Sequence, residues 1–184
     1  MLNVRPLDID GLLEIRPARF GDERGFFSEV WREEEFAAAG IDVRFVQDNH
    51  SYSKRRGVLR GLHFQTPPAA QDKLVRVSCG AIFDVAIDLR RGSPSYGRWA
   101  GTMLSAKEWN QLFIAKGFAH GFVTLEDDTE VLYKCSAPYS PEHERAVRFD
   151  DPAIGIDWPI DLATVTVSEK DRSAPLLAEV GTGF

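Results

Sequence analysis

Two histidines lie in short polar segments whose composition suits acid–base chemistry. His63 and Arg60 belong to the segment GVLRGLHFQ (57–65), where the surrounding aliphatic and aromatic residues predict partial burial. His120 lies between glycines in GFAHGF (117–122). A partly buried imidazole needs a polar partner, and that partner sets its pKa. From the residues alone, a structural and a catalytic role for His63 both remain open, and His120 is equally consistent with a tight turn.

Strand geometry raises a difficulty for this segment. In a flat strand Gly61, His63 and Gln65 face one way, while Arg60 and Leu62 face the other. Arg60 and His63 then line one pocket only if Gly61 marks a β-bulge or if Arg60 curls around an edge. The sequence leaves this question open.

Four further positions combine a functional interpretation with an ordinary structural one. Arg24, in the turn GDERGFF (21–27), suits anion binding or simply a charged turn. Lys73 begins an expected strand and is also typical of an edge-strand lysine. Tyr133 is consistent with a half-buried aromatic, and Asp171, in the helix-start motif SEKD, with a helix cap.

The two histidine segments are spaced like the two motifs of metal-binding cupins, but the ligands differ. Gln65 stands where those proteins have a second histidine after His63, and no glutamate follows at short spacing. Two imidazoles, from His63 and His120, make a poor catalytic metal site, which usually has three protein ligands. We therefore expect no bound metal.

Composition narrows the class of protein. The 184 residues, 43% hydrophobic and 27% charged, fit a single globular domain spanning 1–184. The net charge of −6 argues against nucleic acid as the main partner. Two cysteines, no signal-peptide pattern at the N-terminus and no long apolar stretch predict a cytoplasmic protein that does not bind membranes.

The elements expected to position these residues are mostly strands. Phe83, Val85 and Ile87 alternate with polar or small residues, which is the period of a β-strand, and two short strands are expected around Gly117. Frequent glycine and proline turns favour an antiparallel β-sandwich of jelly-roll type. One short helix is predicted over 32–39, before Gly40, and another begins after Ser168, ahead of the apolar run APLLAEV.

The chain closely resembles the dTDP-4-dehydrorhamnose 3,5-epimerase family. The resemblance covers nearly the whole chain, through FGDERGFFSE, FVQDNHS, GVLRGLHFQ, KLVRV, FDVAIDLRRGSPSYGRW, GFAHGF, the tyrosine of EVLYK, YSPEHE and SEKD. The departures are small: Ala115 replaces a usual proline, and one residue is gained or lost near the RRG segment.

This resemblance implies a mainly β, metal-free, cupin-like jelly-roll sandwich with short helices near the N- and C-termini. It also implies a homodimer with residues of both subunits near each site, no cofactor, and a dTDP-4-keto-6-deoxy-hexose substrate. His63 would be the catalytic base, oriented by Asp171, with Tyr133 as proton donor and Lys73 beside the C4 oxygen. The substrate contacts implied are Arg24, Glu29, Gln47, Asn49, Arg60, Lys73, His120, Glu144 and Lys170, with Tyr139 stacking on the thymine.

These roles suit inversion of C3 and C5 in dTDP-4-dehydro-6-deoxy-D-glucose, giving dTDP-4-dehydro-L-rhamnose. Protons on carbons next to the C4 ketone are acidic, and their removal places negative charge on its oxygen, which Lys73 can stabilise. An imidazole suits the abstraction, and inversion needs a second group, a phenol, on the other face. A mono-epimerase acting on C3 or C5 only, a keto-isomerase, a non-catalytic sugar-binding cupin and a metal-dependent cupin oxygenase are the alternatives.

Overall fold

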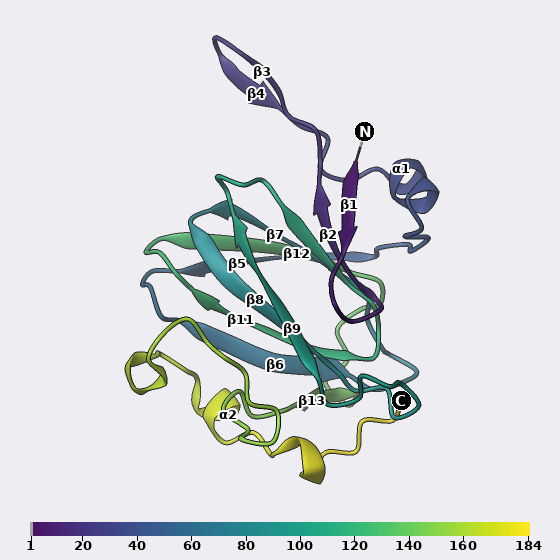
Figure 1. Cartoon of the computed structure of the whole chain (residues 1–184), viewed down its shortest axis with the longest axis vertical. Helices are drawn as coiled ribbons and strands as arrows, with labels where there is room; N and C mark the ends of the chain where they lie inside the picture. Colours follow the sequence, from purple (N-terminus) through teal and green to yellow (C-terminus); the bar gives the residue numbers. More distant parts are fainter. Residues whose placement is uncertain (1) are drawn as a thin grey trace.

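The computed structural model describes residues 2–184, and strands dominate it (Figure 1). In chain order the elements are β1 (Asn3–Pro6), β2 (Leu12–Arg16), β3 (Phe20–Asp22), β4 (Gly25–Phe27), α1 (Glu33–Ala38), β5 (Gln47–Ser53), β6 (Leu59–Gln65), β7 (Lys73–Cys79), β8 (Ala81–Asp88), β9 (Trp99–Ser105), β10 (Gln111–Ile114), β11 (Phe118–Thr124), β12 (Thr129–Cys135), β13 (Glu144–Ala146), η1 (Leu162–Thr164), α2 (Glu169–Arg172) and η2 (Leu177–Glu179).

Two antiparallel sheets form the body of the fold. The six-stranded sheet has the order β1-β2-β10-β7-β12-β5, and the five-stranded sheet has the order β13-β6-β11-β8-β9. Apolar residues of both sheets, such as Val75 and Leu112 from one and Ile82 and Phe122 from the other, share one buried cluster. The expected mainly β sandwich with short helices is confirmed, because these facing apolar surfaces must cover each other.

The five-stranded sheet is also covered on its other face. Val85 and Ile87 of β8 pack with Trp158 and Leu177 of the C-terminal segment, which runs along the β6 side of the molecule in Figure 1. The strand predicted from the alternation of Val85 and Ile87 is therefore confirmed, but both of its faces are buried. Polar residues on its inward face consequently have no access to bulk water.

Both predicted helices are present and short. α1 ends before Gly40, whose φ of +89° is the left-handed conformation expected after a helix. The Ser168 hydroxyl accepts from the backbone N–H of Asp171 and so caps α2. This helix stops at Arg172 because Pro175 follows, and the expected apolar helix is reduced to the single turn η2.

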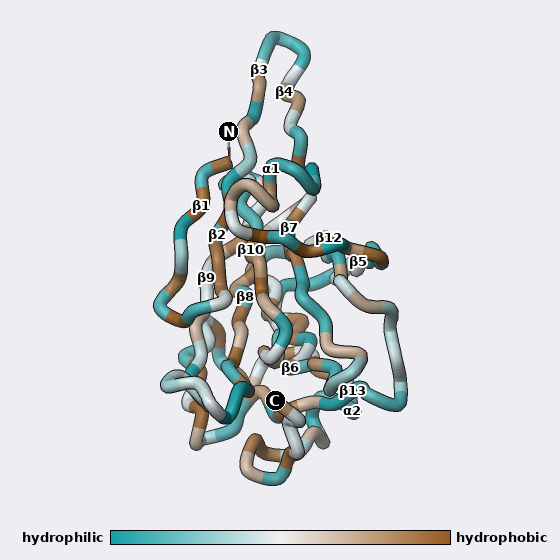
Figure 2. Tube along the Cα trace, turned by 90° about the vertical axis from the view of Figure 1, so that its right-hand side faces the viewer, coloured by the Kyte–Doolittle hydropathy of each residue, from teal (hydrophilic) through white to brown (hydrophobic). Residues whose placement is uncertain are grey.

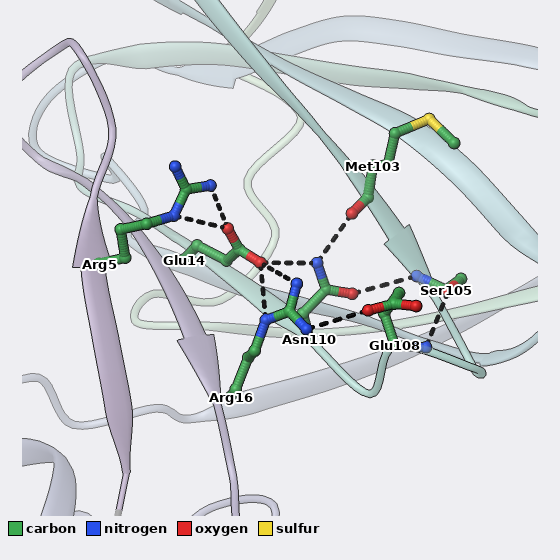
Figure 3. Close-up of polar contacts among 7 residues, drawn as sticks. All are labelled: Arg5, Glu14, Arg16, Met103, Ser105, Glu108 and Asn110. Atoms are coloured by element: carbon green, nitrogen blue, oxygen red, sulfur yellow. Dashed lines mark hydrogen bonds and ion pairs between the residues drawn. The ribbon is translucent and has the colours of Figure 1, made fainter.

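A buried polar cluster, drawn in Figure 3, joins the N-terminal strands to the turn between β9 and β10. Glu14 of β2 is 4% exposed and accepts hydrogen bonds from Arg5, Arg16 and Asn110. Asn110 also donates to the backbone oxygen of Met103 at 2.8 Å. We call these residues the Glu14 cluster, and it ties β1 and β2 to the end of β9.

The β3–β4 hairpin projects beyond the sandwich, as both ribbon and tube views show (Figures 1 and 2). Its aromatic side chains Phe20, Phe26 and Phe27 are 64%, 51% and 69% exposed, although the Phe26 ring also meets Trp109 edge-on at 4.8 Å. Three exposed phenylalanines on one hairpin form an unusual apolar surface for an isolated chain. Among residues 2–184, no helix has the length and apolar character needed to cross a bilayer.

Candidate active site

A β-bulge at Gly61 places Arg60 and His63 on the same side of β6. His120 of β11 pairs with His63, and Phe122 pairs with Arg60, so three steps along β6 match two along β11. Gly61 has a φ of +121°, and a Cβ there would lie 2.5 Å from the Cα of Gly121. The question that the sequence left open is thus answered by a β-bulge at Gly61, where only glycine can make this close approach.

The bulge opens onto a cavity of about 450 Å³ between the two sheets. The five-stranded sheet, the six-stranded sheet and the segment 166–171 all contribute to its lining. The predicted site residues on this lining are Arg60, His63, Lys73, His120, Tyr133, Lys170 and Asp171. A second cavity of about 120 Å³ shares three of them, His63, Lys73 and Tyr133, and adds Gln47, Asn49, Tyr139 and Glu144.

His63 is held by the buried carboxylate of Asp171. The His63 Nε2 lies 2.6 Å from the Asp171 Oδ1, and the Gly61 N–H donates to Oδ2 at 3.3 Å. Burial alone would raise the pKa of Asp171, but the hydrogen bond and charge of His63 together with the Gly61 N–H lower it below its ordinary value. Because Ser168 caps α2, the interpretation of Asp171 as the cap is wrong, and its carboxylate is free to orient the imidazole.

Tyr133 approaches the same cavity from the opposite sheet. It lies on β12, and its neighbours Val131 and Cys135 share its inward face as the alternation predicts. Burial raises the pKa of the Tyr133 phenol above its usual value, and the nearby Cys135 adds to that shift. The phenol therefore keeps its proton at neutral pH and can act as a donor.

Lys73 is buried on β7 of the six-stranded sheet, and its side chain reaches β6 of the facing sheet. Its strand β7 lies between β10 and β12, so the interpretation as an edge-strand lysine is wrong. Only 8% of the residue is exposed, and its Nζ donates to the His63 carbonyl at 3.4 Å. Burial lowers the pKa of Lys73, while nearby acidic groups oppose that shift.

A second imidazole–carboxylate pair lies beside the first. The His120 Nε2 is 2.5 Å from the Oδ1 of Asp84, and Asp84 is fully buried. Burial lowers the pKa of His120 even though Asp84 opposes the shift. Sequence reasoning missed Asp84. The signal available was an acidic residue on a strand whose neighbours Val85 and Ile87 are apolar, since a buried acid requires a partner.

Polar residues gather where the smaller cavity meets the surface. Glu144 Oε2 accepts from the Tyr139 hydroxyl at 2.9 Å and from the Lys170 Nζ at 2.6 Å. Burial would raise the pKa of Glu144, but these two partners lower it. Gln47 accepts from the Tyr139 backbone N–H at 2.8 Å and donates to Asn49 at 3.0 Å. The arrangement offers donors, acceptors and an exposed aromatic ring to a polar ligand.

Two predicted contacts, Arg24 and Glu29, lie away from both cavities of this chain. Arg24 is at the tip of the β3–β4 hairpin, is 85% exposed and pairs with Asp22 at 2.5 Å. Glu29 pairs with Arg32 at 3.1 Å near the start of α1. Within a single copy these two residues therefore do not join the other predicted site residues.

The cavity combines groups suited to proton transfer at a carbon next to a carbonyl. An imidazole oriented by a carboxylate can take a proton on one side, and a phenol from the facing sheet can supply one on the other. A buried lysine on the same cavity lining can stabilise a developing oxyanion. In residues 2–184 no three His, Cys, Asp or Glu side chains cluster in a way that could hold a metal ion.

Comparison with known proteins gives a consistent result. The family model described as dTDP-4-dehydrorhamnose 3,5-epimerase matches residues 6–179. The chain is 55% identical over 170 residues to the dTDP-4-dehydrorhamnose 3,5-epimerase of Sinorhizobium fredii, covering 92% of this chain and 87% of that protein.

Solved structures agree with the sequence comparison. The fold is similar to a dTDP-6-deoxy-D-glucose-3,5-epimerase from Legionella pneumophila in complex with dTDP-4-keto-L-rhamnose, with a TM-score of 0.94 and 45% identity, covering 98% and 95% of the two chains. It is also similar to a dTDP-4-dehydrorhamnose 3,5-epimerase from Bacillus anthracis with TDP and PPi bound, with a TM-score of 0.93 and 43% identity, covering 96% and 99%.

Proposed function

The chain belongs to the dTDP-4-dehydrorhamnose 3,5-epimerase family, and from this premise we propose that it inverts C3 and C5 of dTDP-4-dehydro-6-deoxy-D-glucose to give dTDP-4-dehydro-L-rhamnose. One observation carries the proposal: His63 and Tyr133 come from facing sheets and line one cavity, together with Lys73 from the strand next to that of Tyr133. Groups on opposite sides of a planar intermediate are what inversion at carbon requires.

The base in this mechanism is His63. Its Nε2–H donates to Asp171, which leaves the Nδ1 lone pair to accept the substrate proton. As the imidazolium forms, the neighbouring carboxylate stabilises its charge, in the way that a buried aspartate supports the histidine of a catalytic triad. Removal of the proton from C5 or C3 gives an enolate because the C4 ketone accepts the electron pair.

Lys73 and Tyr133 complete the reaction. The ammonium of Lys73 stabilises the enolate oxygen, and its burial strengthens this interaction because water does not screen it. Tyr133 then protonates the carbon on the face opposite His63. The proton left on His63 and the one lost by Tyr133 return to their starting positions through solvent, so the enzyme is restored without a cofactor.

The polar residues at the smaller cavity are proposed to hold the nucleotide. Tyr139 offers an exposed ring for stacking on thymine, while Gln47, Asn49 and Arg60 offer donors to the diphosphate. Binding energy from this remote part of the substrate would position the sugar for proton transfer.

Deuterium exchange in heavy water tests the function directly. Wild-type protein with the 4-keto sugar nucleotide is expected to incorporate deuterium at both C3 and C5, followed by NMR, with His63→Ala as the control that abolishes exchange at both carbons. Label at one carbon only would identify a mono-epimerase. Binding of the nucleotide sugar without exchange would identify a sugar-binding module.

We also propose that the chain works as a homodimer in which the β3–β4 hairpin reaches the partner's cavity. The exposed Phe20, Phe26 and Phe27, together with the distance of Arg24 from its own cavities, support this arrangement. Mixing Arg24→Ala and His63→Ala proteins, each of low activity, is expected to restore part of the activity through mixed dimers. An inactive mixture of exchanged subunits would count against a shared site.

The cytoplasm is the proposed compartment. Both cysteines, Cys79 and Cys135, are free thiols, which supports a reducing environment.

A further inference from the structure

Asp84 has an unusual environment for a group that does not line the cavity. It lies on β8 behind His120, none of its surface is exposed, and its Oδ1 is bound by the His120 imidazole. Its second oxygen, Oδ2, has no hydrogen-bond partner among residues 2–184. Burying a carboxylate oxygen without a hydrogen-bond partner costs folding free energy. This cost points to a role for Asp84 beyond its pair with His120.

Lys73 has the complementary problem, because its buried ammonium makes one long hydrogen bond within residues 2–184, to a carbonyl. A buried ammonium needs a countercharge to remain protonated. The titratable groups that act on Lys73 or line its two cavities are Arg60 and His63 on β6, Asp84 on β8, His120 on β11, Tyr133 and Cys135 on β12, Tyr139 after β12, Glu144 on β13, and Lys170 and Asp171 on α2.

These groups differ in the negative charge that they can offer to Lys73. Burial raises the pKa of the Cys135 thiol, which therefore stays neutral, and burial does the same for Tyr133. Glu144 is charged, but Lys170 and Tyr139 already occupy its Oε2. His63 and His120 are neutral or positive. Asp171 is buried and charged, but the His63 imidazole and the Gly61 N–H occupy its two oxygens. Among residues 2–184, Asp84 is thus the one carboxylate of this set with a buried oxygen that has no hydrogen-bond partner.

We propose that Asp84 is a positioning residue for the reaction proposed above, whose carboxylate fixes the His120 ring and supplies the countercharge that keeps Lys73 an ammonium. The proposal rests on the proposed function, because the ammonium is what stabilises the enolate oxygen. Burial draws Lys73 toward the neutral amine, and Asp84 opposes that change through the charge it places behind His120. Loss of the charge would leave a neutral lysine beside the C4 oxygen.

The substitution Asp84→Asn tests this role, because it keeps an acceptor for His120 and removes the charge. We expect kcat for epimerisation to fall about 10- to 100-fold at neutral pH, with KM nearly unchanged. The alkaline limb of the kcat profile is expected to move down by about one pH unit or more, since Lys73 loses its proton earlier. In a Lys73→Ala background, the second substitution should lower residual deuterium exchange less than about twofold.

Asp88→Asn is the matched control. Asp88 lies on the same strand and is also fully buried, but it is bound by Arg90, Ser93 and Ser95, whereas Asp84 is bound by His120. This variant is expected to lose stability and keep the wild-type alkaline limb. An Asp84→Asn enzyme that folds and keeps the wild-type pH profile would refute the countercharge role and leave Asp84 a structural residue.

A measurement on the wild-type protein covers the case in which Asp84→Asn fails to fold. With lysines labelled at Cε, the NMR signal of Lys73, assigned by comparison with Lys73→Arg, is expected to show an ammonium at pH 7.5. A neutral amine at that pH overturns the inference. If the wild-type protein exchanges no deuterium at C3 or C5, the proposed function fails, whereas the state of Lys73 is read independently of turnover.

Discussion

Glu14 and Asp171 are equally buried, each about 4% exposed, yet their partners belong to different chemical classes. Glu14 is held by the guanidinium groups of Arg5 and Arg16 (Figure 3), and Asp171 by the imidazole of His63. A guanidinium keeps its proton at every working pH, whereas an imidazole gains and loses one near neutrality. The first arrangement can only hold strands together, while the second can transfer a proton.

The same contrast occurs within one strand. Asp88 of β8 is bound by Arg90 and two serines, and four residues earlier Asp84 is bound by His120. Both carboxylates are fully buried. Burial alone therefore does not distinguish a structural acid from one that serves the cavity. The two kinds of buried acid differ in whether the partner can gain and lose a proton. Substitutions at matched positions can test that distinction.

The largest expected effect is on the Asp171–His63 pair. Asp171→Asn presents an amide to Nε2 and favours the wrong tautomer, so kcat for deuterium exchange should fall roughly 10³- to 10⁴-fold. Glu14→Gln, at the same burial, should keep exchange within about twofold. Loss of less than about tenfold for Asp171→Asn would show that the carboxylate does not orient the base.

The next largest effect distinguishes proton removal by His63 from protonation by Tyr133. Tyr133→Phe removes the phenolic proton while His63 remains, so inversion should slow about 100-fold and exchange should slow less. Deuterium incorporation and the appearance of the inverted sugar are followed in one NMR time course. Equal losses in both rates would indicate that Tyr133 acts in proton removal as well.

In contrast to the two preceding substitutions, a change in the Glu14 cluster is expected to affect the stability of the fold. Glu14→Gln removes the negative charge and replaces one of the two acceptor oxygens with an NH₂ donor, so either Arg5 or the pair Arg16 and Asn110 loses its acceptor. We expect the free energy of unfolding to fall by about 1 to 3 kcal/mol in urea titrations. The control is Glu108→Gln, because Glu108 pairs with Arg16 at 3.0 Å but is 52% exposed. That variant should change stability by less than about 0.5 kcal/mol. A similar loss of unfolding free energy in Glu14→Gln and Glu108→Gln would show that burial does not set the contribution of these ion pairs to stability.

A stability effect of similar size is expected to depend on pH. Burial would raise the pKa of Asp88, but Arg90 and two serines lower it from 3.8 to about 2. A carboxyl with a depressed folded-state pKa stabilises the fold above its unfolded pKa and loses that contribution as pH falls toward 2. This contribution is about 2 kcal/mol. The difference in unfolding free energy between wild type and Asp88→Asn should shrink as the pH falls from 3.8 to about 2. A constant difference over that range would refute the link between the Asp88 pKa and stability.

Local patterns in the sequence were sufficient to predict several of the strands and helices. The alternation around Val85 predicted β8, Gly40 marked the end of α1, and Ser168 marked the start of α2, since each depends on neighbours a few residues away. Resemblance supplied the remaining roles, and the structure brings most of those residues to two adjoining cavities. Arg24 and Glu29 are the exceptions within one copy.

Only the tertiary structure decided which polar groups are buried and paired. Asp171 is 108 residues from His63 in the chain, and Asp84 is 36 residues from His120. No local spacing encodes such contacts, and the bulge that turns Arg60 toward the cavity depends on how closely Gly61 approaches Gly121 across two strands. Residue types fix what chemistry a side chain can perform. Its charge state and direction depend on desolvation and on partners that folding alone brings within reach.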